Sequence, residues 1–169
     1  FLLADPAGVA HLFWAEKVGD LSTNQPDTLL YSQLKDGVWS KPVDIFFAPL
    51  SDGAPVINFP HAVIDQAGKI HLIWLSEPNA PNYSLNYSSA YAEQAGIVQA
   101  WEPKRILADD LTGSLYSIHI AYDPPSTLHI LYARGAQGSN PEDDRSVAYI
   151  RSTDLGKTWS EPRALLTVP

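Results

Sequence analysis

The sequence predicts an all-β protein built from three similar units of four strands each. No window longer than about eight residues keeps the apolar periodicity of a helix, whereas short strand-like runs recur along the chain. Aromatic residues make up 11% of the 169 residues, and the 14 prolines and 10 glycines supply frequent turns. One pattern of residues also returns at intervals of 60 and 58, measured between His11, His71 and His129.

Each unit begins with an innermost strand that ends at an aspartate, followed by a strand with the histidine near its start. The third strand is aligned on a serine, and the fourth carries Trp and Pro. The matching segments are 5–8, 65–68 and 123–126 (aspartate turns), 11–14, 71–74 and 129–132 (second strands), 30–32, 86–88 and 150–152 (third strands), and 39–42, 101–103 and 159–162 (fourth strands). We expect one segment, 1–169, with units at 1–48, 56–108 and 114–168, and strands near 8–16, 28–33 and 38–45 in the first.

The strongest local signal lies between the third and fourth strands of the last unit. Asp154 can accept hydrogen bonds from the backbone two residues on, Gly156 can adopt a positive φ, and Trp159 can fold back as an apolar plug. The pattern Ser-x-Asp-x-Gly-x-Thr-Trp resembles the Asp box of the bacterial neuraminidase repeat in sialidase-like β-propellers. Its defining residues, which the resemblance implies are structural, are Ser152, Asp154, Gly156, Thr158 and Trp159.

The first two units match this motif less well. The first keeps Ser32 and Trp39 but has Leu34 in place of the aspartate, and the second separates Ser88 from Trp101 by thirteen positions. The resemblance therefore covers the whole chain as a repeat and one unit as a motif. It implies a β-propeller of four-stranded antiparallel blades, with three blades here and six in the complete sialidase-like ring.

The resemblance also implies where binding chemistry lies. Asp boxes lie on the face away from the active site, and the loops on the opposite face are here 16–27, 46–58, 77–83, 108–116 and 135–145. Sialidase chemistry implies three arginines that grip a carboxylate, a tyrosine with a glutamate partner, and an aspartate. Only Arg134 and Arg145 fall on this rim, and Arg105, Arg151 and Arg163 are expected to be solvated surface charges. We therefore expect no complete catalytic site in this segment.

The candidate ligand-binding residues lie near the expected propeller axis. They are Asn58, His61, Tyr116 and His119, with Arg134 at the edge. For the two histidines of the innermost strands, structural and functional interpretations both remain open, because packing alone does not explain a polar side chain there.

For the other candidate residues we favour a structural or surface role over a functional one. We expect a structural role for the repeated His11, His71 and His129, and a place in the core between blades for Trp14, Trp74 and Tyr132. The acidic pairs and runs 109–110 and 142–144 are typical of a solvated surface, although carboxylates can also bind Ca²⁺ or act in glycoside hydrolysis.

Composition and charge limit the classes of partner and cofactor that we expect. A formal charge of −8 disfavours nucleic acid, and no apolar run reaches the ~18 residues of a membrane span. The absence of Cys excludes disulfides, thiol catalysis and Cys-ligated zinc, and we expect no cofactor and no metal. The resemblance implies an extracellular or cell-surface location. Two function classes remain: a glycan-directed propeller, either carbohydrate-binding or part of an exo-glycosidase, and a non-catalytic scaffold for protein interaction or surface assembly.

The repeat also predicts that two apolar blade faces lack a packing partner within this segment. In a row of three blades, the first and third each leave an apolar face without a neighbour. We therefore expect either self-association of two copies or the remaining blades of a longer parent chain.

Overall fold

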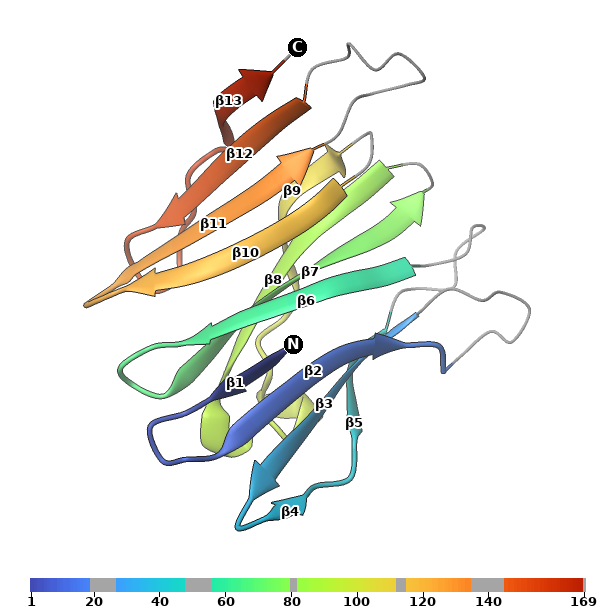
Figure 1. Cartoon of the computed structure of the whole chain (residues 1–169), viewed down its shortest axis with the longest axis vertical. Helices are drawn as coiled ribbons and strands as arrows, with labels where there is room; N and C mark the ends of the chain where they lie inside the picture. Colours follow the sequence, from blue (N-terminus) through green and yellow to red (C-terminus); the bar gives the residue numbers. More distant parts are fainter. Residues whose placement is uncertain (19–26, 48–55, 80–81, 112–114, 135–144, 169) are drawn as a thin grey trace.

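The computed structural model describes residues 1–18, 27–47, 56–79, 82–111, 115–134 and 145–168. They form three antiparallel sheets that follow one another along the chain, here called blades 1, 2 and 3 (Figure 1). Blade 1 contains β1 (Leu2–Ala4), β2 (Ala10–Glu16), β3 (Thr28–Lys35), β4 (Val38–Trp39) and β5 (Val43–Phe47). Blade 2 contains β6 (Val56–Ile64), β7 (Lys69–Asn79), β8 (Asn82–Tyr91) and β9 (Arg105–Leu111). Blade 3 contains β10 (Leu115–Asp123), β11 (Thr127–Arg134), β12 (Arg145–Ser152) and β13 (Arg163–Val168).

The prediction of an all-β fold with three four-stranded propeller blades is confirmed. The described residues contain no α-helix, and the turn between β8 and β9 holds two short 3₁₀ turns, Ala92–Gln94 and Val98–Ala100. The fourth strand of blade 1 is split into β4 and β5, which both pair with β3. Pro42 stands in the gap between them, and its missing N–H prevents a continuous ladder.

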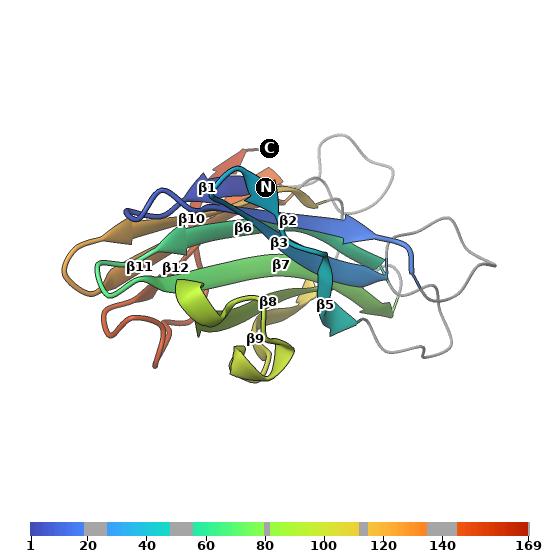
Figure 2. The same cartoon turned by 90° about the horizontal axis from the view of Figure 1, so that it is seen from below.

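The blades pack face to face, so β7 and β8 of the middle blade are buried on both sides. Figure 2 shows the sheets layered on one another, with β6 of blade 2 beside β2 and β10 of its neighbours. One apolar core joins blades 1 and 2 around Phe13, Leu72 and Trp101, and a second joins blades 2 and 3 around Leu85 and Ile130. Trp74, 1% exposed, stacks on Phe46 of blade 1 with ring centroids 4.4 Å apart.

Strand register shows which residues correspond between blades. The second-strand histidines pair with the third strand in the order His11–Gln33, His71–Ser89 and His129–Arg151. The third strand is therefore aligned by Tyr31, Tyr87 and Tyr149. The sequence alignment of this strand is wrong by two residues in the third unit, because the register makes Ile150 the counterpart of Ser32 and Ser88, whereas Ser152 is the last residue of β12.

Candidate functional site

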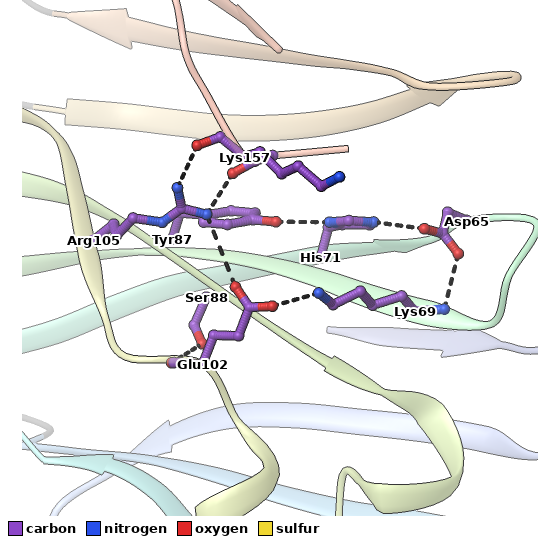
Figure 3. A network of polar contacts seen from close by, with 9 residues as sticks. Asp65, Lys69, His71, Tyr87, Ser88, Glu102, Arg105 and Lys157 are labelled. Atoms are coloured by element: carbon purple, nitrogen blue, oxygen red, sulfur yellow. Dashed lines mark hydrogen bonds and ion pairs between the residues drawn. The ribbon is translucent and has the colours of Figure 1, made fainter. Parts of the chain in front are cut away.

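Each blade contains a row of three polar side chains, Asp, His and Tyr, that joins its first three strands. Figure 3 shows the row of blade 2, from Asp65 through His71 to Tyr87. The histidine Nδ1 to tyrosine Oη distances are 2.7, 2.8 and 2.6 Å in the pairs His11–Tyr31, His71–Tyr87 and His129–Tyr149. The histidine Nε2 to carboxylate distances are 3.4, 3.1 and 3.9 Å to Asp5, Asp65 and Asp123. The predicted structural role of the repeated histidines is confirmed by these contacts.

The histidines of the rows in blades 1 and 2 are buried. His11 and His71 are 1% and 0% exposed. Burial lowers the pKa of both imidazoles, and the neighbouring carboxylates oppose that effect only in part. Burial also raises the pKa of Tyr87 to about 12. These imidazole and phenol groups are neutral hydrogen-bonding partners in the core near pH 7.

The 152–159 turn is held by its own side chains. The Asp154 carboxylate accepts hydrogen bonds from Thr158 N at 2.9 Å and Thr158 Oγ1 at 2.6 Å, and Ser152 Oγ donates to it at 2.8 Å. These bonds lower the Asp154 pKa to about 2, with the Thr158 hydroxyl as the largest cause. The backbone donor lies four residues on, not two as predicted, since the turn is longer than a two-residue Asx turn. Gly156 has the predicted positive φ, 81°.

Arg105 is not the solvated charge that its sequence position predicted. Its guanidinium group donates to the backbone carbonyl oxygen of Lys157 at 2.9 Å and also to that of Gly156, so blade 2 binds the 152–159 turn of blade 3 (Figure 3). The same group lies over the Tyr87 ring, 5.1 Å from its centroid. The prediction failed because the carbonyl partners lie about 50 residues away in a neighbouring blade.

The tryptophans of the fourth-strand position also connect blades. Trp159 lies edge-on to Tyr87 of blade 2 at 5.0 Å, and Trp101 lies edge-on to Tyr31 of blade 1 at 6.5 Å. Trp159 therefore packs at the junction of blades 2 and 3. Among the second-strand aromatics, Trp74 and Tyr132 are core residues as predicted, whereas Trp14 is only half-buried on the free face of blade 1.

Two histidine rings meet along the innermost strands, and we call His61 and His119, together with Phe59 two residues before His61 in β6, the axial cluster. The rings of His61 and His119 meet edge to face at 4.8 Å, which brings together two of the predicted ligand-binding residues. The centroid of the Phe1 ring lies 4.1 Å from that of His61. His119 is exposed and His61 is half-buried.

His61 has an unusual electrostatic environment. Its Nδ1 atom is buried and has no hydrogen-bond partner among the described residues. Burial, followed by the nearby His119 and the N-terminal ammonium group, lowers the His61 pKa to about 4. The imidazole is therefore neutral at pH 7, and its Nδ1 atom still lacks a hydrogen-bond partner among the described residues. A buried polar group without a partner requires an explanation in a folded protein.

Phe59 is a candidate that the sequence reasoning missed. It has a positive φ of 55° and is 50% exposed, in a strand whose register shifts between Asn58 and His61. A positive φ is costly for a bulky side chain, and such backbone strain is concentrated at functional sites. The Phe59–Pro60 dipeptide was the available signal, since proline within a strand marks a bulge.

The other predicted site residues are placed by their backbone. Asn58 is half-buried and pairs with Leu75, and Arg134 ends β11 opposite Leu115 of β10. Tyr116 lies in β10 between Leu115 and Ser117, where the register of β10 against β11 shifts. The side chains of Tyr116, Arg134 and Arg145 lie outside the described residues. So do most of the predicted rim loops, including the acidic run 142–144.

A groove lies between the innermost strands of the three blades, at the end where these strands lead into the aspartate turns. This groove of about 570 Å³ is lined by residues of β1, β6 and β10 and by the turn after β1, including Leu3, Ala62 and Tyr122.

Within the described part of the chain, no group of three His, Asp or Glu side chains is arranged to hold a metal ion. None of the described helical segments is long and apolar enough to cross a membrane.

Solved structures of low sequence identity share this fold. An ulvan lyase of polysaccharide lyase family PL25 has a TM-score of 0.65 at 12% identity, and the match covers 98% of this chain and 43% of the lyase. The Hadza microbial sialidase Hz136 has a TM-score of 0.63 at 14% identity, with 98% of this chain and 37% of the sialidase covered. The chain thus spans less than half the length of either structure. No protein-family model and no curated protein sequence matches it.

Proposed function

We propose that this chain is part of a sialidase-like, glycan-directed β-propeller in which the axial cluster contacts a sugar. The observation that carries the proposal is the exposed imidazole of His119, which meets the His61 ring at 4.8 Å on the innermost strands, next to a buried His61 Nδ1 that has no partner among the described residues. A sugar hydroxyl can both donate and accept hydrogen bonds, so it suits neutral imidazole nitrogens. A charged ligand group is a poorer match, because the low pKa keeps His61 neutral.

Phe59 supports the same assignment. Binding sites commonly combine aromatic rings with a few polar groups that fix the orientation of the ligand. A half-exposed phenyl ring on a strained bulge gives an apolar surface for the C–H face of a sugar, two residues from His61. The glycan class is also supported by the structural neighbours, whose names describe a polysaccharide lyase and a sialidase. An extracellular or cell-surface location follows as part of this proposal.

We further propose that the segment does not complete a sialidase active site by itself. Arg105 is engaged with backbone carbonyls of blade 3, and Arg151 and Arg163 are exposed away from the axial cluster on β12 and β13. That leaves Arg134 and Arg145, which border the 135–144 loop, where the family chemistry implies three arginines. Any catalysis would need residues from further blades.

A glycan array tests the proposal, with neutral, sialylated and uronic-acid-containing oligosaccharides presented to the purified chain. We expect at least one class to bind, and Phe59→Ala and His61→Ala each to weaken that binding at least tenfold. Tyr91→Ala is the matched control, since Tyr91 is 48% exposed but lies at the opposite end of its blade. Absence of binding to all classes, or equal loss in the control, would favour the non-catalytic scaffold instead.

A further inference from the structure

The two junctions between blades share one contact between corresponding residues, and each junction has a further contact of its own. At the first contact, a third-strand tyrosine meets the fourth-strand tryptophan of the next blade, as in Tyr31–Trp101 and Tyr87–Trp159. The second contact is made at the junction of blades 1 and 2, where Phe46 of the outer strand stacks on Trp74 of the next blade. The third contact is made by Arg105, which binds the turn of the next blade.

The free face of blade 1 carries the tryptophan half of such a junction. Trp39 occupies the position of Trp101 and Trp159 but is 47% exposed, and Trp14 occupies that of Trp74 but is only half-buried. The turn Asp36–Gly37 corresponds to the 152–159 turn and has positive φ values of 52° and 77°. A Cβ built on Gly37 has no neighbour within 4 Å, whereas one on Gly156 would overlap Tyr87.

The free face of blade 3 carries the other half. Arg163 pairs with Tyr149 in the register in which Arg105 pairs with Tyr87, and it is exposed. Leu166 pairs with Val147 as Phe46 pairs with Leu29, and it is 56% exposed. His129, the counterpart of two fully buried histidines, has a side chain that is 33% exposed.

We propose that blade 3 of one copy docks on blade 1 of a second copy, head to tail, through a third junction of the same kind. In it, Tyr149 meets Trp39, Leu166 meets Trp14, and Arg163 binds the carbonyls of the 36–37 turn of the other copy. The partner is a second copy, because the residues at these positions on the two free faces are the two halves of contacts that the junctions within the chain already contain. Contact between unlike faces gives a closed ring when the rotation closes and a filament when it does not.

Sedimentation equilibrium of the purified chain over a range of concentrations tests the proposal. We expect a mass above the 18.5 kDa of one copy that rises with concentration to a fixed multiple. Trp39→Asp damages only the blade 1 face, and Leu166→Asp damages only the blade 3 face. Each is expected to raise the dissociation constant at least tenfold, whereas Ile97→Asp, which changes an exposed apolar residue of blade 2, should leave it unchanged.

Mixing the two face variants makes the test specific for unlike faces. Each variant keeps one intact face, so an equimolar mixture should form a one-to-one heterodimer that neither variant forms alone. Circular dichroism and melting of the dilute variants check that each is folded. A monomer at every concentration, leaving the faces to another polypeptide, would overturn the proposal. So would an assembly that both variants leave intact, or a mixture that forms no heterodimer.

Discussion

Arg105 donates a hydrogen bond to the backbone carbonyl of Lys157 at 2.9 Å, and this contact ties the start of β9 to the turn before β13. The bond crosses from blade 2 to blade 3, so a turn that is stabilised internally by Asp154 is also clamped from outside. The guanidinium group suits this role because it keeps its charge and presents several N–H donors in one plane.

Arg105→Gln should lower the free energy of unfolding by about 1–2 kcal/mol, below the upper range for charged hydrogen bonds because the side chain is partly exposed. Chemical denaturation monitored by tryptophan fluorescence measures this. Arg151→Gln is the control, since Arg151 is exposed and no side-chain hydrogen bond to it is described. Equal effects of the two substitutions would show that the contact across the junction contributes nothing.

Gly156→Ala should destabilise the fold more than Gly37→Ala does. Both glycines have φ near +80°, at 81° and 77°, so the backbone strain of the two substitutions is matched. Only the Cβ at position 156 meets an obstacle, because it would lie 2.7 Å from Tyr87 Cζ. We expect an excess loss of about 1–3 kcal/mol, the usual cost of overpacking. Equal melting temperatures for the two variants would contradict the tight packing of Gly156 on Tyr87.

The three fourth-strand tryptophans should differ in their contribution to stability although they share a repeat position. Trp101 is 6% exposed and donates from Nε1 to Ala95 O at 3.0 Å, so Trp101→Ala should cost about 3–5 kcal/mol. Trp159 is half-buried, which lowers the expected cost to about 2–3 kcal/mol. Trp39→Ala should change the unfolding of the dilute monomer by less than about 0.5 kcal/mol. A different order in urea denaturation would refute the assigned junctions.

The low pKa of His61 predicts a pH-dependent contribution to stability. Between about 4, its folded value, and the ordinary 6.5, the unfolded chain binds a proton that the folded chain does not. This contribution is therefore complete above pH 6.5 and decreases as the pH falls towards 4. His61→Gln should reduce the slope of unfolding free energy against pH in that window, while His11 and His71 keep theirs. An unchanged slope would mean that His61 is more solvated than its burial indicates.

The sequence predicted the structural features that recur in every blade. Period, strand order and the structural role of His11, His71 and His129 could be predicted, because each blade repeats the same hydrogen-bonded row. Alignment failed at Tyr149 because Ser152 at the end of β12 was matched to Ser32 and Ser88, whose register counterpart is Ile150.

Contacts between blades could not be predicted from one unit. The partners of Arg105 and the exposure of Trp39 depend on which blade lies next to which face. Phe59 was missed for a related reason, since its φ of 55° is a property of the bulged strand and not of the residue type.

Histidine side-chain NMR during a glycan titration tests the central claim most directly, because the chain has only five histidines. With a glycan identified on the array, we predict that the imidazole resonances of His61 and His119 shift in proportion to binding. Those of His11 and His71 should stay in place, since both are buried in the rows. Binding that leaves His61 and His119 unchanged would contradict a glycan site at the axial cluster.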